Sequence, residues 1–167
     1  MKDRDEIDAQ LSRVLDFFPR VDTKASGLFA VDSAILTIAA LNVKPADLQL
    51  WYVGGPAVLT VIGLLASYFY LYRCNFPVTS GGEGSLIYFV EVQKRTEANY
   101  IEEYEDADEQ RYRRDLLGQV WRNSQILCSK YKDVSAALRW TLAALLPFAV
   151  LLSTTAYVHS TMPVIKS

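Results

Sequence analysis

The stretch that most constrains the fold is Ala107–Val158, in which Pro147 is the only proline. Its first part is rich in charged side chains, and its last part, from Trp140 onward, is apolar. A helix of about twenty apolar residues crosses the hydrocarbon core of a bilayer. The stretch therefore predicts one helix that runs from water into the membrane without a break. Such a helix links the cytosolic region mechanically to the membrane-spanning region.

Composition agrees with a small membrane protein. The chain has 167 residues, 51% of them hydrophobic and 22% charged, and the two kinds are segregated along the sequence. This length favours one domain. The net charge of -2 argues against a nucleic-acid partner, which usually selects a basic protein. Cys74 and Cys128 lie far apart and predict no disulfide, and the acidic N-terminal segment shows no cleavable signal peptide.

The apolar segments predict an all-α membrane protein with three transmembrane helices and a cytosolic helical region. The last span is continuous with the long cytosolic helix. Aromatic residues at both ends of the second span suit the two headgroup belts. The predicted segments are an amphipathic N-terminal helix 1–21, a first span 22–43, a short external loop 44–50, a second span 51–73, a cytosolic linker and helix 74–106, a long helix 107–158 whose part 140–158 is the third span, and an external tail 159–167.

The basic residues predict the orientation. They gather in the N-terminal segment and between Arg73 and Arg139, whereas the first loop carries Lys44 and the tail carries Lys166. Loops rich in lysine and arginine stay on the cytoplasmic side. We expect a cytoplasmic N-terminus and an external C-terminus.

The N-terminal helix carries apolar residues at helical spacing from Ile7 to Phe18, and Pro19 is expected to end or kink it. We expect this helix to pack on the cytosolic bundle, with a position on the lipid surface as the alternative. Asp22 or Thr23 is expected to cap the following helix by accepting a backbone N–H.

Asp32 stands about two turns inside the first span, where a carboxylate is costly unless it faces protein or water. Ser33 and Thr37 belong to the same run of small and polar residues, which lets another helix approach closely. Two interpretations follow. Asp32 is a packing contact within the bundle, or the three residues line an oligomer interface or a conducting path.

Two segments predicted to be cytosolic are candidates for a ligand-binding site. Glycines follow the second span in Gly81-Gly82-Glu83-Gly84, but no phosphate-binding motif is present, so a flexible linker is the better interpretation. The long helix carries a heptad stripe from Leu117 to Leu138, which predicts bundle core. Its other face carries Arg122, Asn123 and Lys130, which form either a solvated face or an anion or nucleotide site.

The sequence shows no set of residues typical of an enzyme active site. The one histidine, His159, is predicted at the outer membrane edge, and two cysteines are too few for a cysteine metal cluster. The acids between Glu102 and Glu109 form a run rather than an opposed pair. We predict a protein that is not an enzyme and that has no metal site and no cofactor.

The chain resembles the Pycsar transmembrane effectors, small bacterial inner-membrane proteins of antiphage defence. The resemblance rests on Asp22-Thr23-Lys24-Ala25-Ser26, on Leu86-Ile87-Tyr88-Phe89-Val90-Glu91 and on Arg122–Leu127 followed by Lys130-Tyr131. It implies a partner cyclase that makes cUMP or cCMP, and an effector that then impairs the inner membrane. The residues carried over as an expected ligand site are Asp22, Lys24, Ser26, Arg122, Asn123 and Lys130.

The segment between the second and third spans is too short for a full cyclic-nucleotide-binding domain. A site would have to be assembled from the N-terminal arm and the long helix, or across subunits. Three alternatives remain: an effector of cyclic-oligonucleotide (CBASS-type) defence, a membrane scaffold or regulatory subunit without a ligand, and a constitutive channel. The expected partners are the lipid bilayer, a cyclic mononucleotide and further copies of the chain in a homo-oligomer.

Overall fold

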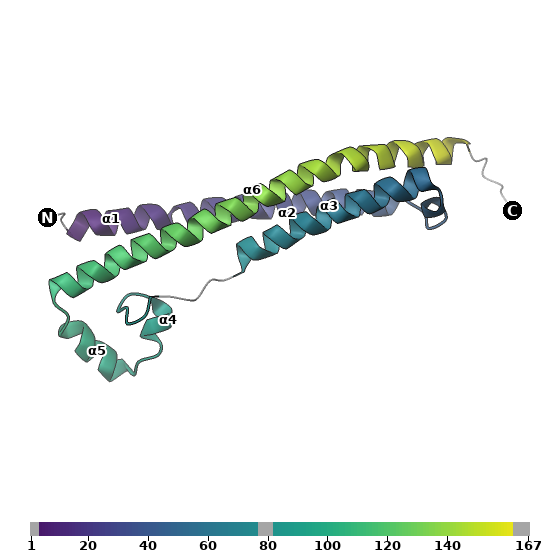
Figure 1. Cartoon of the computed structure of the whole chain (residues 1–167). Coiled ribbons are helices and arrows are strands. Elements are labelled where there is room, and N and C mark those ends of the chain that lie inside the picture. The colour runs from purple at the N-terminus through teal and green to yellow at the C-terminus, as the bar shows by residue number, and fades with distance from the viewer. Residues whose placement is uncertain (1–3, 77–81, 162–167) are drawn as a thin grey trace. The chain divides into compact units, whose positions relative to one another are not determined.

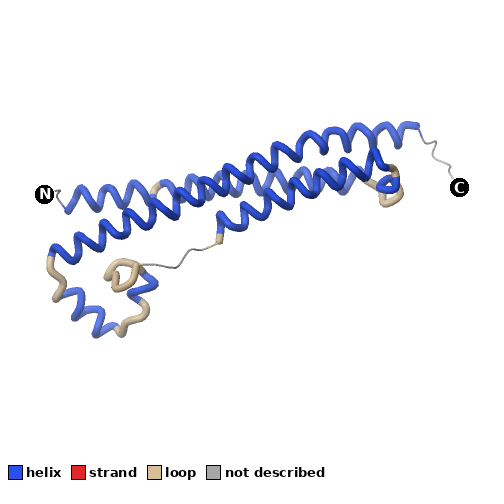
Figure 2. Tube along the Cα trace, viewed as in Figure 1, coloured by secondary structure: helices blue, strands red, loops and turns tan. Residues whose placement is uncertain are grey.

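The computed structural model describes residues 4–76 and 82–161, and within them every regular element is a helix (Figures 1 and 2). The predicted all-α fold is confirmed, and so is the continuity of the last apolar segment with the long helix. Residues 77–81 of the predicted linker and 162–167 of the predicted tail lie outside the described residues. The elements are α1 (Arg4–Leu15), α2 (Phe17–Asn42), the 3-10 turn η1 (Asp47–Gln49), α3 (Trp51–Asn75), α4 (Phe89–Val92), α5 (Glu97–Glu105) and α6 (Glu109–Thr161).

Three helical segments are long and apolar enough to cross a membrane: Asp5–Asn42, Trp51–Asn75 and Glu109–Ser160. They overlap the three predicted spans, although Val43, the last residue of the predicted first span, lies beyond the helix. Helix α6 carries its charged part and its apolar part in one helix. The chain therefore has the helices of a membrane protein with three spans.

The chain divides into two compact units, which we describe separately. The loop unit comprises the described residues up to Val21 together with Phe76 and 82–131. The bundle unit comprises residues 22–75 and the described residues from Lys132 onward. Helices α2 and α6 contribute residues to both units, and α3 belongs to the bundle unit alone.

In the bundle unit, α3 runs antiparallel to its neighbours. Ile35 of α2, Leu64 of α3 and Ala144 of α6 form one buried cluster. Farther along, Val53 at the start of α3 packs with Leu151 and Val158, late in α6. Low residue numbers in α3 thus meet high numbers in α6, as expected for three helices that cross one bilayer in alternating directions.

Polar contacts mark both ends of this bundle. Arg73 of α3 pairs with Asp133 of α6 at 3.6 Å, and His159 near the end of α6 contacts Asp47 of η1 at 3.0 Å. At ~1.5 Å per residue, the α6 segment between Asp133 and His159 is about 39 Å long. A bilayer with its headgroups is ~40–45 Å thick. The two polar contacts are therefore spaced to lie near the two water boundaries.

The start of α2 differs from the expectation. Asp22 and Thr23 do not cap a helix, because α2 begins at Phe17 and both residues lie inside it. Pro19 stands in the first turn of α2, where a missing N–H costs little. The same missing donor leaves the carbonyl of Leu15 without its usual partner four residues on, and α1 ends at Leu15.

Helix α6 begins after Asp108, whose Oδ1 accepts the backbone N–H of Arg111 at 2.7 Å. Such a cap satisfies one of the free donors at a helix start. The helix continues through Pro147 to Thr161, so this proline does not end it.

Candidate functional site

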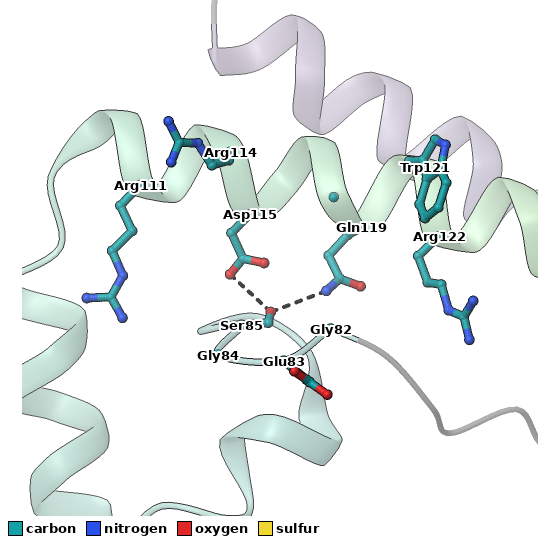
Figure 3. A pocket seen from close by; sticks show the side chains of 11 residues that line it. Gly82, Glu83, Gly84, Ser85, Arg111, Arg114, Asp115, Gln119, Trp121 and Arg122 are labelled. Carbon is teal, nitrogen blue, oxygen red and sulfur yellow. Dashed lines mark hydrogen bonds between the residues drawn. The ribbon is translucent and has the colours of Figure 1, made fainter.

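A cavity of about 510 Å³ lies in the loop unit (Figure 3). Small-molecule sites commonly enclose ~300–1,000 Å³. Its wall is formed by one face of α6 and by the glycine-containing loop that precedes α4. The lining residues are Gly82, Glu83, Gly84, Ser85, Arg111, Arg114, Asp115, Gly118, Gln119, Trp121 and Arg122.

Helical spacing explains the α6 face. Arg111, Asp115, Gln119 and Arg122 follow one another at steps of four, four and three residues, which places them on one side of the helix. In Figure 3 their side chains leave the helix toward the loop, with an arginine at each end of the row. The face therefore offers positive charge at both ends and polar groups between them.

The loop owes its shape to two glycines. The N–H of Ser85 donates to the carbonyl of Gly82 at 2.9 Å and closes a four-residue turn. Gly84, the third residue of this turn, has φ of 73°, and Gly82 has φ of 77°. A side chain at Gly82 would also place its Cβ 2.8 Å from the ring of Tyr88. Residues with a Cβ rarely adopt such angles, so glycine is required here.

Asp115 fastens this loop to α6. Its Oδ2 accepts the hydroxyl of Ser85 at 3.0 Å and the backbone N–H of Leu86 at 2.8 Å. Gln119 donates to Ser85 Oγ at 3.2 Å, and Ser85 is buried. The described part of the predicted flexible linker is thus a fixed, hydrogen-bonded turn, which differs from the expectation.

Arg95 also stabilises the loop, through its backbone carbonyls. Its guanidinium donates to the carbonyls of Gly84 at 3.2 Å, Ser85 at 3.1 Å and Glu91 at 2.8 Å. It also pairs with Glu103 at 3.2 Å. The hydrogen bond from Arg95 is the main reason that the pKa of Glu103 is lowered from its ordinary value, and the charge of Arg111 adds to the effect. The loop is therefore held by hydrogen bonds from within its own unit.

The cavity combines positive charge with an exposed aromatic ring. Its lining includes three arginines, Arg111, Arg114 and Arg122, and two carboxylates, those of Glu83 and Asp115. Arg111 also pairs with Glu103 at 3.3 Å. Asp115 already accepts two hydrogen bonds, and Arg114 makes no side-chain hydrogen bond or ion pair within the described part of the chain. The side chain of Trp121 is 64% exposed. Guanidinium groups bind phosphate, and aromatic faces stack on bases.

The residues expected at the ligand site fall into both units. Of the six, only Arg122 lines the cavity. The amide of Asn123 donates to the carbonyl of Gln119 at 2.8 Å, within its own helix. Lys130 is also in the loop unit but outside this lining, whereas Asp22, Lys24 and Ser26 lie in α2 as part of the bundle unit. A joint site of these six residues stays a prediction.

Sequence reasoning missed most of the lining, namely Arg111, Arg114, Asp115, Gln119 and Trp121. A signal was present, because the spacing from Arg111 to Arg122 follows one helix face. The glycine loop was set aside because it matches no known phosphate-binding pattern. Its role depends on Asp115, which lies 30 residues away from Ser85, and no local motif reports that contact.

The carboxylate inside the first span is buried within its own chain. Asp32 is 0% exposed and accepts the hydroxyl of Ser67 from α3 at 2.6 Å and that of Thr141 from α6 at 2.8 Å. Ser33 bonds Tyr68 at 3.1 Å, and the exposed Thr37 donates to the carbonyl of Ser33 at 2.8 Å. An oligomer interface or path at these residues stays a prediction.

A comparison with protein families decides the identity. The family described as the Pycsar effector protein domain matches residues 6–157. The chain belongs to the Pycsar effector family. A search of curated proteins found no match, and a search of solved structures found none either.

The match confirms the resemblance. It covers Trp51–Asn75 entirely, nearly all of the other two apolar helices, and every residue of the loop cavity. This Pycsar effector is accordingly a membrane protein of the antiphage transmembrane effector type.

Proposed function

We propose that this Pycsar effector is activated by a cyclic pyrimidine mononucleotide, cUMP or cCMP, and then impairs the bacterial inner membrane and arrests growth. A partner cyclase supplies the nucleotide. The effector itself catalyses no reaction. The observation that carries the proposal is the family match across residues 6–157, which includes nearly all of the three helices able to cross a membrane.

The two units support this division of work. The bundle unit is apolar and suited to lipid, with its polar pairs near the two ends. The loop unit contains a cavity with three arginines, a fitting environment for a phosphate. Helix α6 contributes to both units, so a ligand that prefers one conformation of α6 shifts the membrane helices as well.

Direct evidence for activation would come from co-expression in bacteria. We expect growth arrest and entry of a membrane-impermeant dye when the effector is expressed with an active pyrimidine cyclase. A catalytically inactive cyclase is the matched control and should leave cells intact. Equal dye entry with both cyclases would contradict activation by the nucleotide, and no dye entry with either would contradict damage to the membrane.

The proposed orientation places the N-terminus in the cytoplasm and the C-terminus outside the inner membrane. The lysines and arginines that gather in the N-terminal segment and between Arg73 and Arg139 support it. The contact between Asp47 and His159 adds that the short loop and the end of α6 lie at one end of the bundle. The exposed Cys128 provides the test, since Cys74 is buried. A membrane-impermeant maleimide should label Cys128 in inside-out vesicles and spare it in spheroplasts.

The matched variant for this test is Cys128→Ser with Ser160→Cys, which moves the exposed thiol to the other end of α6. Its labelling should be reversed, with reaction in spheroplasts. Labelling of Cys128 in spheroplasts would overturn the orientation.

We further propose that several copies act together. Asp32 is the carboxylate deep inside a predicted span, and it bonds two hydroxyls of its own chain. A conducting path lined by polar groups therefore needs more than one copy. Crosslinking in membranes, with and without cUMP, should give dimers or larger species; a monomer under both conditions would contradict the proposal.

A further inference from the structure

The cavity in the loop unit is the strongest candidate for the ligand-binding site of the effector. It is the part of the loop unit where arginines, an exposed indole and a fixed backbone turn meet. This location differs from a site shared between the N-terminal arm and the long helix.

The net charge of the lining selects among anions. The lining holds three arginines and two carboxylates, and Arg111 also pairs with Glu103 at 3.3 Å, so the positive charge that remains for a ligand is small. A 3′,5′-cyclic phosphodiester carries one negative charge, whereas a nucleoside triphosphate or a cyclic dinucleotide carries more. Glu83 and Asp115 repel this additional charge. The cavity therefore favours a cyclic mononucleotide over more highly charged nucleotides.

The aromatic group supplies the second element of recognition. Trp121 lies one residue before Arg122, and both line the cavity. An exposed indole presents a flat apolar face, and stacking on such a face holds a base without regard to its hydrogen-bonding edge. Arginine and tryptophan together thus provide for the two ends of a nucleotide, its phosphate and its base.

The loop is preformed, which favours binding. Ser85 is held by Asp115 and Gln119 on one side, and its carbonyl by Arg95 on the other. A site that already has its shape pays less conformational entropy when a ligand arrives.

We propose that the cavity between the Gly82–Ser85 loop and the Arg111–Arg122 face of α6 binds the cyclic mononucleotide. Arg111 and Arg122 bind its phosphate, and Trp121 stacks on its base. This assignment rests on the proposed function, which supplies the class of ligand. Asp115 is a positioning residue, because it holds the loop.

Binding is tested by calorimetry on the full-length protein in detergent, with cUMP and cCMP as probes. Arg111→Ala and Arg122→Ala should each weaken binding by about 10- to 100-fold, because each removes charge-assisted hydrogen bonds to phosphate. Arg13→Ala is the matched control, since Arg13 is an exposed helical arginine of the same unit outside the cavity. It should bind as the unchanged protein does.

Stacking and charge selection have their own variants. Trp121→Ala should weaken binding at least tenfold, and Trp121→Phe should restore most of it, because phenylalanine keeps an aromatic face. The rescue separates stacking from a general loss of structure, and thermal unfolding without nucleotide checks that each variant is folded. 5′-UMP, which carries more charge than cUMP, should bind more weakly than cUMP.

The outcomes distinguish the two proposals. If the unchanged protein binds cUMP or cCMP and the two arginine variants bind equally well, the site assignment fails and the function stands. If the cyclase arrests growth but the protein binds neither nucleotide, the site also fails, and the trigger reaches the effector by another route. If a cyclic dinucleotide binds instead and Arg122→Ala abolishes that binding, the cavity is a nucleotide site but cyclic-pyrimidine activation fails, and with it the ligand class assigned here.

Discussion

Asp32 in the bundle unit and Asp115 in the loop unit both accept a hydrogen bond from a serine hydroxyl, but their surroundings differ. Asp32 is fully buried and joins three helices through Ser67 and Thr141. Asp115 is half-buried and joins a loop to one helix through Ser85 and Leu86. In lipid, a carboxylate is tolerated only with partners inside the protein. In water it can fix a loop at little cost.

Removal of Asp32 is expected to have the largest effect on stability. Asp32→Ala deletes two interhelical hydrogen bonds, and such bonds in membranes contribute up to ~1.7 kcal/mol each, so we expect a loss of about 3 kcal/mol at most. Thermal unfolding in detergent would measure it. Asp32→Asn should cost less, and Thr37→Ala, at an exposed position, is the control. An unchanged melting temperature in Asp32→Ala would show that the network does not stabilise the bundle.

The glycines of the two units offer a second contrast. A Cβ on Gly63 would lie 2.8 Å from the Cβ of Ala144, so Gly63 permits α3 and α6 to pack closely. A Cβ on Gly84 would meet nothing within 4 Å, and there φ of 73° is the constraint. Gly63 is needed because a neighbouring helix lies close, whereas Gly84 is needed because its backbone has a positive φ.

Gly63→Ala should destabilise the bundle by about 2 kcal/mol through overpacking, and Ala144→Gly should restore the lost stability in the double variant. Gly84→Ala should cost about 1–2 kcal/mol through backbone strain, and no neighbouring change should rescue it. Gly84→Asn is the matched control, since asparagine tolerates positive φ. Thermal unfolding compares the four variants with the unchanged protein. Rescue of Gly84→Ala by a change at a neighbouring residue would contradict the assignment of its effect to backbone strain.

Asp115 gives the third and more local effect. Asp115→Ala removes the acceptor of two hydrogen bonds, and at about 1 kcal/mol for each bond the loop should open roughly thirtyfold more often. Hydrogen exchange of peptides covering Gly82–Tyr88 would record faster exchange, with little change in the bundle peptides. Both bonds go to Oδ2, so Asp115→Asn can keep them with its amide oxygen. Equal exchange in the alanine variant and the unchanged protein would remove Asp115 as the loop anchor.

The sequence was sufficient for the helices and insufficient for the cavity. Hydropathy alone predicts the three apolar helices, because burial in lipid acts on every residue of a span. The heptad stripe was less reliable: Val120 and Val134 are buried, but Leu117 and Leu138 are each 44% exposed. Packing in the loop unit follows Leu116 and Gln119 instead. The face that α6 buries depends on contacts distant in sequence, such as Ser85 with Asp115, which periodicity does not contain.

The smallest predicted effect concerns acid pH and tests whether the two units titrate alike. In each unit a carboxylate outside the spans has a lowered pKa because it accepts a hydrogen bond. Asp47 accepts first from the backbone N–H of Lys44 and then contacts His159, whereas Glu103 accepts from Arg95. A carboxylate with a lowered pKa contributes stability above its unfolded pKa, which is ~3.9 for Asp and ~4.3 for Glu. That contribution is lost as the pH falls through the lower folded value.

We therefore expect the melting temperature to decline below about pH 4, and Asp47→Asn should flatten part of this decline. Glu103→Gln should flatten another part, and because the two residues belong to different units, their effects should add in the double variant. Glu103 is partly exposed, and solvent screens its ion pairs, which keeps its effect small. A decline of the same steepness in Asp47→Asn would mean that the Asp47 contacts do not stabilise their end of the bundle. A double variant flatter than the sum would show that acid opens the two units together.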